Sequence, residues 1–415
     1  MRMANLCHRL VRDRRGAMAM ITALSMPVLI GGVGLAADTI QWTYMKRAMQ
    51  RQADSAALAG AFAMSQQNVI STTVTADLAR NNNVLLTVTP VIQSPPTAGA
   101  YSGDARAVRV ALATDVRLPF VGFVMGGPIR IPAEATAKVI SQGQYCVLAL
   151  ETLNTTGVTI NGNTTLDFGC GIMSNSPSAS SVTAGGSSVI NATPIAAVGG
   201  VPTSNNYAAG TQLIPYSVPQ FDPLAALPTP DIRNSSNNGN VNPNQVRDLV
   251  PGNYSGMDIK GTANFAPGIY YIDGGQFSLG SQAIINGTGV TIILTSKNTA
   301  DSPSTIATAD INGTAQVNLT APTSGTYAGV LFYQDRRALD NATNKFNGTS
   351  NSKYQGAIYF PKQQLRFNGT AGMDIKCMQL IGRRVDFIGD SSITNVCPAN
   401  SGASSFSGTR VKLVA

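Results

Sequence analysis

The pattern of hydrophobic and polar positions changes sharply along this chain of 415 residues. Near its start lies an apolar run, Ala17–Ala37, which contains no charged residue. As a helix this run would be about 31 Å long, which matches the thickness of a bilayer core. Beyond Asp38, apolar residues recur mostly at steps of three and four up to Phe62, a spacing typical of a helix. We therefore predict a membrane-spanning helix at 17–37 that continues past the membrane.

Basic residues before the apolar run predict its orientation. Residues 1–16 carry five arginines and one acidic residue, Asp13. By the positive-inside rule, this basic tail stays in the cytoplasm and the rest of the chain lies across the membrane. A cleaved signal peptide is the alternative, but the apolar region of such a peptide has only about 7–15 residues. The longer run, which continues into more helix, favours an uncleaved anchor.

The formal net charge of +8 follows this topology. Residues 1–37 carry +4, residues 38–140 carry +3, and residues 141–415 carry only +1. Half of the excess therefore lies in the tail beside the predicted span. The large C-terminal part has no cluster of Lys and Arg with interleaved aromatic residues, so the sequence predicts no nucleic-acid partner.

Residues 38–140 are predicted to form a small α+β domain. Three segments after the helix are rich in β-branched residues and partly alternate between polar and apolar positions: 84–92, 107–116 and 129–140. Such segments favour strands. One long helix followed by a few antiparallel strands resembles the arrangement of pilins, so we expect a pilin-like unit here.

Residues 141–415 have a different composition, in which Asn, Gly, Thr and Ser dominate and helical periodicity disappears. Similar segments recur in this part. Gly329-Val-Leu-Phe-Tyr-Gln and Gly356-Ala-Ile-Tyr-Phe-Pro start 27 residues apart, and the Asn-Gly pairs at Asn286 and Asn312 are 26 residues apart. Periods in the twenties are typical of coils of stacked short strands.

We therefore predict that residues 141–415 form a mainly-β domain, a right-handed parallel β-helix. Asn and Gly suit the corners of such coils, because they tolerate left-handed backbone, and Asn side chains can stack between coils. A β-sandwich with Asn-Gly hairpins is the alternative. Proline and asparagine clusters within 174–253 predict a loop-rich excursion from the domain.

Cysteine spacing agrees with a coiled β domain. Cys146 and Cys170 are 24 residues apart, and Cys377 and Cys397 are 20 residues apart. Either interval is close to one coil, which would place the partners on neighbouring strands about 4.8 Å apart, within disulfide range. We predict both disulfides in an oxidising compartment and a free thiol at Cys7 on the cytoplasmic side. Metal binding is the weaker alternative, because there is no Cys-x-x-Cys and no histidine nearby.

Three N-terminal segments carry a resemblance to a known family. Arg15-Gly-Ala-Met-Ala, Gly34-Leu-Ala-Ala-Asp38 and Met49-Gln-Arg-Gln-Ala-Asp54-Ser-Ala-Ala-Leu58-Ala-Gly-Ala resemble the N-terminal module of TadG-like proteins. That family belongs to the tight-adherence (Flp) pilus assembly system of bacteria. The resemblance covers about fifty residues and marks a membrane-anchor and helix-contact motif at Arg15, Gly16, Asp38, Gln50, Asp54, Ala57, Leu58 and Gly60.

The resemblance implies a structural component of the bacterial inner membrane, with its C-terminal bulk in the periplasm. Its expected partners are the lipid bilayer, through residues 17–37, and other tight-adherence pilus assembly proteins; it implies no cofactor. Asp38 is expected to mark the membrane boundary, and Asp54 to solvate the helix near Arg51. Prepilin-type processing is not expected, because Ile21 stands where such processing favours Glu.

Two further classes of protein compete with a structural role. The chain has one histidine, His8, in the cytoplasmic tail, so His-based catalysis is excluded from the β domain. A polysaccharide-degrading enzyme could still use a carboxylate pair, with candidates Asp335, Asp374, Asp386 and Asp390 near Arg336, Arg337, Arg383 and Arg384. A glycan-binding module could use an aromatic platform of Tyr270, Tyr271, Phe332, Tyr333, Tyr354, Tyr359 and Phe360. Solvated charges and a filled core are the favoured interpretations of these residues, and the sequence predicts no enzyme.

Overall fold

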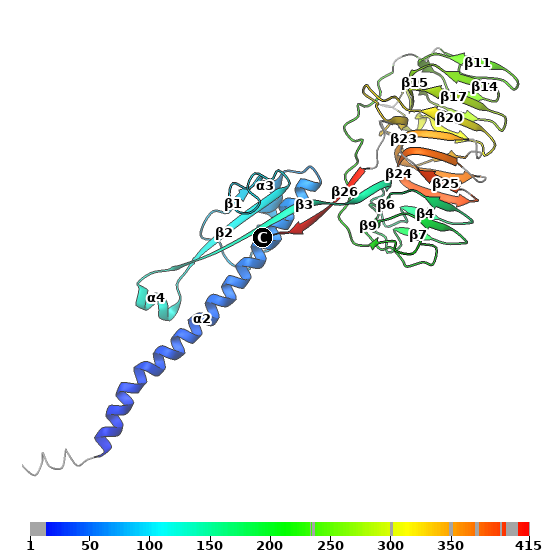
Figure 1. The fold of residues 1–415 in the computed structure, drawn as a ribbon. Coiled ribbons are helices and arrows are strands. Elements are labelled where there is room, and N and C mark those ends of the chain that lie inside the picture. Colours follow the sequence, from blue (N-terminus) through cyan, green and yellow to red (C-terminus); the bar gives the residue numbers. More distant parts are fainter. Residues whose placement is uncertain are drawn as a thin grey trace, which may run out of the picture. The chain divides into compact units, whose positions relative to one another are not determined.

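The computed structural model describes residues 14–232, 234, 237–298, 302–347, 352–369, 373–390, 392–395 and 406–414. The chain divides into two compact units (Figure 1). Unit 1 comprises Met1–Ile140 and Val411–Ala415, and unit 2 comprises Ser141–Arg410. Strands β3 (Ile129–Ala149) and β26 (Phe406–Leu413) each contain residues of both units, so the chain passes between the units twice.

Helix α2 (Arg14–Ser65) runs through the predicted span and far beyond it. This confirms the prediction of one long apolar N-terminal helix. Pro27 lies inside the helix without ending it. The most apolar part of α2 is not buried by other described residues, and Val28 is 73% exposed. A helix that crosses a bilayer presents an apolar surface of this kind to lipid.

The second half of α2 packs in unit 1 against helix α3 (Ile70–Arg80) and against an antiparallel sheet. The sheet pairs β1 (Val91–Gln93) with β2 (Ala107–Val116), and β2 with β3. Strand β2 has the predicted bounds, and β3 starts where predicted. Small residues of α2 let its backbone approach these neighbours closely, and those buried are Ala48, Ala53, Ala56, Ala57 and Ala61.

The predicted strand at 84–92 is wrong, because pairing is limited to Val91–Gln93. Pro90 has no N–H group to donate to a ladder. The preceding segment is instead held by side-chain bonds: the Thr114 hydroxyl donates to the Leu85 carbonyl over 2.8 Å. These contacts are long-range, and the local residue pattern does not encode them.

Unit 2 consists mostly of short strands. Those before its long irregular connection are β4 (Val158–Ile160), β5 (Thr165–Asp167), β6 (Gly171–Ser174), β7 (Val182–Ala184), β8 (Val189–Asn191) and β9 (Ile195–Ala197). Strand β10 (Leu213–Ile214) lies within the connection. The following strands are β11 (Val246–Leu249), β12 (Gly252–Tyr254), β13 (Met257–Ile259), β14 (Thr262–Phe265), β15 (Gly268–Asp273), β16 (Gln276–Leu279), β17 (Ile284–Thr288) and β18 (Val290–Thr295). A short 3-10 helix, η1 (Pro303–Thr305), precedes β19 (Thr308–Ile311), β20 (Gln316–Thr320), β21 (Val330–Gln334), β22 (Thr343–Phe346), β23 (Lys353–Gly369), β24 (Met373–Gly389) and β25 (Ser392–Asn395).

These strands form parallel ladders with a period of three strands. Each strand from β11 to β19 pairs with the third strand after it, and the three ladders converge on the long strand β23. The two similar segments at Gly329 and Gly356 lie on paired strands, with Val330 opposite Ala357. The inference that Asn286 and Asn312 occupy equivalent positions in neighbouring coils is wrong, because Asn286 lies opposite Asn318. The prediction of a parallel-rich β domain is confirmed.

The strands stack in a different order from their sequence. Strand β24 pairs with β23 on one side and with β3 and β4 on the other, so the last strands join the first ones. The chain therefore enters the stack in its middle and winds to one end, where β10 pairs with β9. It reaches β11 at the other end through an irregular connection at 198–245 (Figure 1). Strands β7, β8 and β9 lie inside the segment 174–253, so the irregular part is narrower than the predicted excursion.

Side chains fasten this connection to the stack. The Tyr359 hydroxyl donates to Asp222 over 2.6 Å. The Arg336 guanidinium donates to the backbone carbonyls of Leu224 and Leu227 over 2.8 and 2.6 Å. Within the stack, the Asn286 amide on β17 donates to Asn264 on the paired strand β14 over 3.3 Å, so asparagines join neighbouring strands as predicted.

The junction at which the last strands meet the first contains a buried ion cluster. The Glu151 carboxylate is fully buried, and it accepts hydrogen bonds from Arg383 over 2.9 Å and from Arg384 over 2.6 Å. Arg384 also pairs with Asp340. Burial alone would raise the pKa of Glu151, but hydrogen bonds from Arg383, the backbone and Arg384 outweigh it and lower the pKa to about 2. The cluster thus holds Glu151 ionised across the junction.

Replacing Glu151 with Gln tests this junction. Because two arginines lose a buried carboxylate but keep partial solvent contact, we expect E151Q to lower the free energy of unfolding by about 2–3 kcal/mol at neutral pH. The native pKa of Glu151 lies below its ordinary value of 4.5, so its contribution is complete above pH 4.5 and disappears as the pH falls toward 2. The difference between E151Q and wild type, measured by urea unfolding with circular dichroism, should therefore shrink over that range.

The matched control for this experiment is Asp258→Asn, which removes a carboxylate from an exposed pair with Lys260. Exposed pairs contribute little, so the control should unfold like the wild type. Equal stabilities of E151Q and D258N at neutral pH would refute the assigned role of the cluster.

Candidate interaction surface

The predicted motif residues lie along helix α2. Arg15 and Gly16 are in its first turn, where the structure describes the backbone and no side chain. The remaining motif residues lie beyond the apolar run. They divide into residues that hold α2 inside unit 1 and residues that border an open groove.

Asp38 has a partner that the sequence did not reveal. Its side chain is 2% exposed and accepts hydrogen bonds from the backbone N–H groups of Phe120 and Val121, over 2.9 and 2.5 Å. These groups begin helix α4 (Pro119–Met125), where the first N–H groups have no partner within their own helix. The expected boundary residue is thus also a cap for a helix that is remote in sequence.

Gly34 completes the seat of α4, one helical turn before Asp38. A Cβ atom at Gly34 would lie 2.5 Å from the Phe120 ring. Only glycine lets the ring lie this close to the α2 backbone. Helix α4 was not predicted, because its short apolar run shows no helical alternation. Pro119 in its first turn was the available signal.

The middle of α2 is fixed to the sheet by Gln50. Its amide donates to Asp54 over 2.9 Å and to the backbone carbonyl of Glu134 over 2.8 Å. Asp54 therefore contacts Gln50, whereas the sequence suggested solvation near Arg51. One side-chain amide thus ties α2 both to its own next turn and to strand β3.

Ala57 and Gly60 face the interior of unit 1. Ala57 is fully buried, and a Cβ atom at Gly60 would lie 2.8 Å from Val108 and 2.9 Å from Val74. These small residues set how closely α2 approaches α3 and β2. Leu58 is only partly buried and faces the groove between the two helices.

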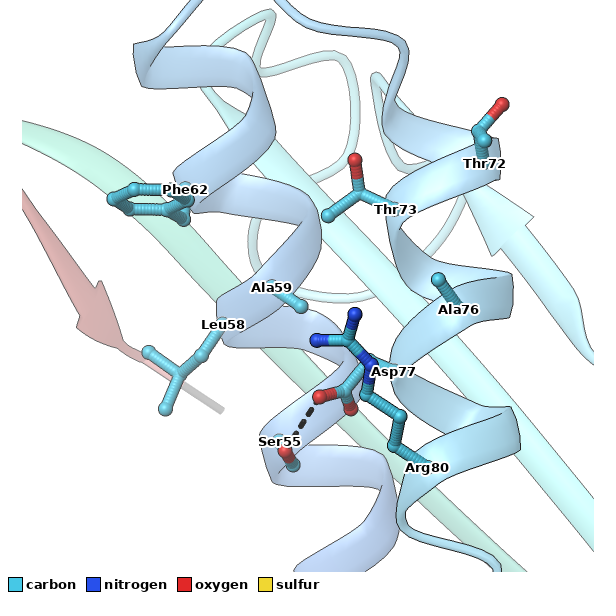
Figure 2. A pocket seen from close by; sticks show the side chains of 9 residues that line it. All are labelled: Ser55, Leu58, Ala59, Phe62, Thr72, Thr73, Ala76, Asp77 and Arg80. Carbon is cyan, nitrogen blue, oxygen red and sulfur yellow. Dashed lines mark hydrogen bonds between the residues drawn. The ribbon is translucent and has the colours of Figure 1, made fainter.

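The groove between α2 and α3 has a volume of about 570 Å³ (Figure 2). It is shallow and open, and Phe62 at its border is 38% exposed. Small and apolar side chains alternate with polar ones along it. Its lining consists of Ser55, Leu58, Ala59, Phe62, Thr72, Thr73, Ala76, Asp77 and Arg80. We call this the α2–α3 groove.

In the α2–α3 groove, only one of the two carboxylate oxygens of Asp77 accepts hydrogen bonds from described residues. Ser55 donates to Asp77 Oδ1 over 3.2 Å, as Figure 2 shows, and Asn81 donates to the same oxygen over 2.9 Å. Asp77 Oδ2 is buried and has no hydrogen-bond partner among the described residues. A buried acceptor without a partner is costly, so a ligand that supplies a donor would be favoured here. An amphipathic helix with one basic or hydroxyl side chain has this chemistry.

The carboxylates proposed as catalytic candidates have other partners. Asp335 is buried and pairs with Arg337, and Asp386 pairs with Arg366. Asp390 accepts a hydrogen bond from Asn163. For Asp374 the structure describes the backbone only. Arg383 and Arg384 bind Glu151, and Arg336 binds the connection. No group of three or more His, Cys, Asp or Glu side chains that could hold a metal occurs in the described parts of the chain.

The proposed aromatic platform is not on the surface. Six of its seven residues are buried, and Tyr271 is partly buried. The rings fill the interior of unit 2, as in the pair Tyr333 and Tyr359, whose centroids are 5.1 Å apart. The glycan-binding alternative therefore loses its structural basis.

Cys146 and Cys170 are paired in the structure, with Cα atoms 5.8 Å apart. Cys146 lies on β3, and Cys170 directly precedes β6, the parallel partner of β3. Cys7 and Cys397 lie outside the described residues, as does the side chain of Cys377, so the second predicted disulfide stays a prediction.

Comparison with protein families gives a match to the N-terminal part of the chain. The family Tad, described as Flp pilus-assembly TadE/G-like, matches residues 16–65. Comparisons with the curated proteins and with the solved structures find no match. The matched segment is helix α2 from Gly16 to its end, including the seat of α4 and one wall of the α2–α3 groove. The match is limited to this helix, and it confirms the resemblance to the TadE/G-like family that the motifs of α2 carry.

Proposed function

We propose that this protein is a structural component of Flp pilus assembly, anchored in the bacterial inner membrane, and that it acts through protein contacts along α2. One observation carries the proposal. The family match coincides with a single helix that has an exposed apolar half and a second half bordering an open groove.

The apolar half of α2 supplies the anchor. Exposed Val, Leu, Ile and Met side chains surround the helix over residues 18–35, and burying them in lipid removes them from water. The basic tail of residues 1–16 favours a cytoplasmic N-terminus, which puts unit 2 in the periplasm. A helix that continues from the membrane into unit 1 would fix that unit close to the bilayer surface.

The α2–α3 groove supplies the contact with another assembly protein. Its small residues permit close approach, Phe62 offers an exposed apolar surface, and Asp77 offers an acceptor without a partner. These features together suit a partner helix with an apolar face and one donor side chain. Another pilus assembly protein is the partner that the family match suggests.

The unit 2 strands are proposed to form a right-handed parallel β-helix. Three parallel ladders with a period of three strands support this fold over a sandwich, in which hairpins would pair neighbouring strands antiparallel. Right-handed crossovers are strongly preferred between parallel strands. Such a fold would act as a stiff periplasmic body.

Replacing two alanines of α3 with tryptophan, one at a time, tests the role of the groove. Ala76 lines the groove, whereas Ala79 is exposed on the same helix outside the groove lining. In a deletion strain, A76W should fill the groove, block the partner helix and reduce surface pili at least tenfold. A79W should restore pili to the wild-type level.

Both variants change an exposed position, so both should accumulate like the wild type in immunoblots. Normal piliation by A76W at a normal protein level would contradict the groove as the contact surface. Loss of piliation by both variants would point to α3 itself and would equally contradict it.

The pairing of Cys146 with Cys170 is proposed to be a disulfide formed in the periplasm. Closing a loop of this length stabilises a fold by about 3 kcal/mol. Peptide mapping of the non-reduced, alkylated protein should yield a linked peptide containing both residues. Alkylated Cys146 and Cys170 in protein isolated from membranes would show that the disulfide is absent.

A further inference from the structure

Helix α4 presents an apolar surface that no described residue of unit 1 covers. Phe123, Val124 and Met125 are 88, 70 and 72% exposed. The helix has no polar side chain, and Gly126 follows it at a positive φ of 72°. Three consecutive large apolar side chains exposed to water would be unfavourable, and such a patch usually marks a contact surface.

The seat of α4 lies at the end of the predicted span. Phe120 fits against Gly34 and lies 3.6 Å from the position that a Cβ atom would take at Gly31. Asp38 binds the first N–H groups of α4. The exposed surface of α4 is therefore close to that of α2, where Ile30 is exposed as well (Figure 1). The two apolar surfaces belong to the same unit and lie side by side.

Hydrogen bonds within the protein satisfy backbone N–H groups of α4, as an apolar environment requires. In lipid, each N–H group needs a partner inside the protein. Asp38 satisfies the N–H groups of Phe120 and Val121, and those of Gly122 and Gly126 donate to the carbonyls of Leu118 and Gly122. In return, α4 shields the Asp38 carboxylate at the level where hydrocarbon would begin.

The residues around α4 suit a membrane interface. Arg117 precedes it and is exposed, and Trp42 lies one turn beyond Asp38 on α2, with its ring partly exposed. Arginine and tryptophan side chains favour the headgroup region, where a cationic or polar end meets an apolar stem or ring. Arg130, which follows α4 in the sequence, forms an ion pair with Asp115.

We propose that α4 is a second bilayer-contacting element, whose residues Phe123–Met125 insert beside α2 into the leaflet on the unit 2 side. The occupant of this surface is lipid, because the surface continues the apolar surface of α2. The proposal rests on the membrane span of α2 proposed above. Its consequence is that unit 1 is held at two points of the membrane and cannot rotate freely about α2.

Tryptophan fluorescence tests the insertion of α4. The chain has one tryptophan, Trp42, so W42F provides a background without any. In that background, single tryptophans are placed at Phe123 in α4, at Val28 in the span, and at Val69, the exposed residue that precedes α3. The full-length protein is reconstituted into liposomes whose lipids carry bromine on the acyl chains, a short-range quencher.

F123W should show blue-shifted emission and quenching close to that of V28W, whereas V69W should be red-shifted and unquenched. Quenching of V28W without quenching of F123W would overturn the insertion of α4 and leave the span intact. Absence of quenching in V28W would refute the span itself. Blue-shifted but unquenched F123W would mean that protein covers α4, which also contradicts the proposal.

Discussion

The close packing of α2 against α3 and β2 is the constraint on which the rest of unit 1 depends. The first half of α2 is mostly exposed, and among the described residues its packing partner is the short helix α4. The helix is positioned by its second half, where Ala57 is buried and Gly60 leaves no room for a side chain. Because α2 is a continuous helix, this packing also determines the direction of the apolar half. The α2–α3 groove and the seat of α4 both follow from the same placement.

Unit 2 solves a different physical problem. Most of its strands are too short to be stable alone, so they depend on parallel neighbours in the ladders. The chain enters the stack in the middle, and its last strands close on its first through Glu151 and the two arginines. This closure makes the stack depend on residues more than 200 positions apart. The fastened connection between the two ends of the stack adds to that dependence.

The sequence predicts those features that local patterns encode. Apolar length predicts α2, and the alternation in residues 107–116 predicts β2 with its exact bounds. Features that depend on distant partners were missed. The segment 84–92 looks like a strand by composition. Pro90 and side-chain hydrogen bonds to β2 keep most of it out of the sheet. Helix α4 is short and uniformly apolar, so its position is decided by Gly34 and Asp38, about 85 residues earlier.

The candidate surface shows the same limit. Leu58 and the small residues of α2 were predicted as a contact motif. The groove also needs a second wall, which α3 provides, and no sequence pattern predicted α3. The repeat period in unit 2 was correct for Gly329 and Gly356 and wrong for Asn312, because coils of unequal length shift the spacing. Local signals identify the elements, and long-range contacts create the surfaces.

Site-specific photo-crosslinking at Phe62 is the most direct test of the α2–α3 groove as the contact surface for another pilus assembly protein. A photoreactive phenylalanine at this groove position, introduced into the full-length protein in cells that assemble Flp pili, should form a covalent adduct with another pilus assembly protein. A photoreactive residue at Tyr216, exposed on unit 2, serves as the comparison. Adducts with an assembly protein are expected at Phe62. Adducts that form at Tyr216 and not at Phe62 would contradict it.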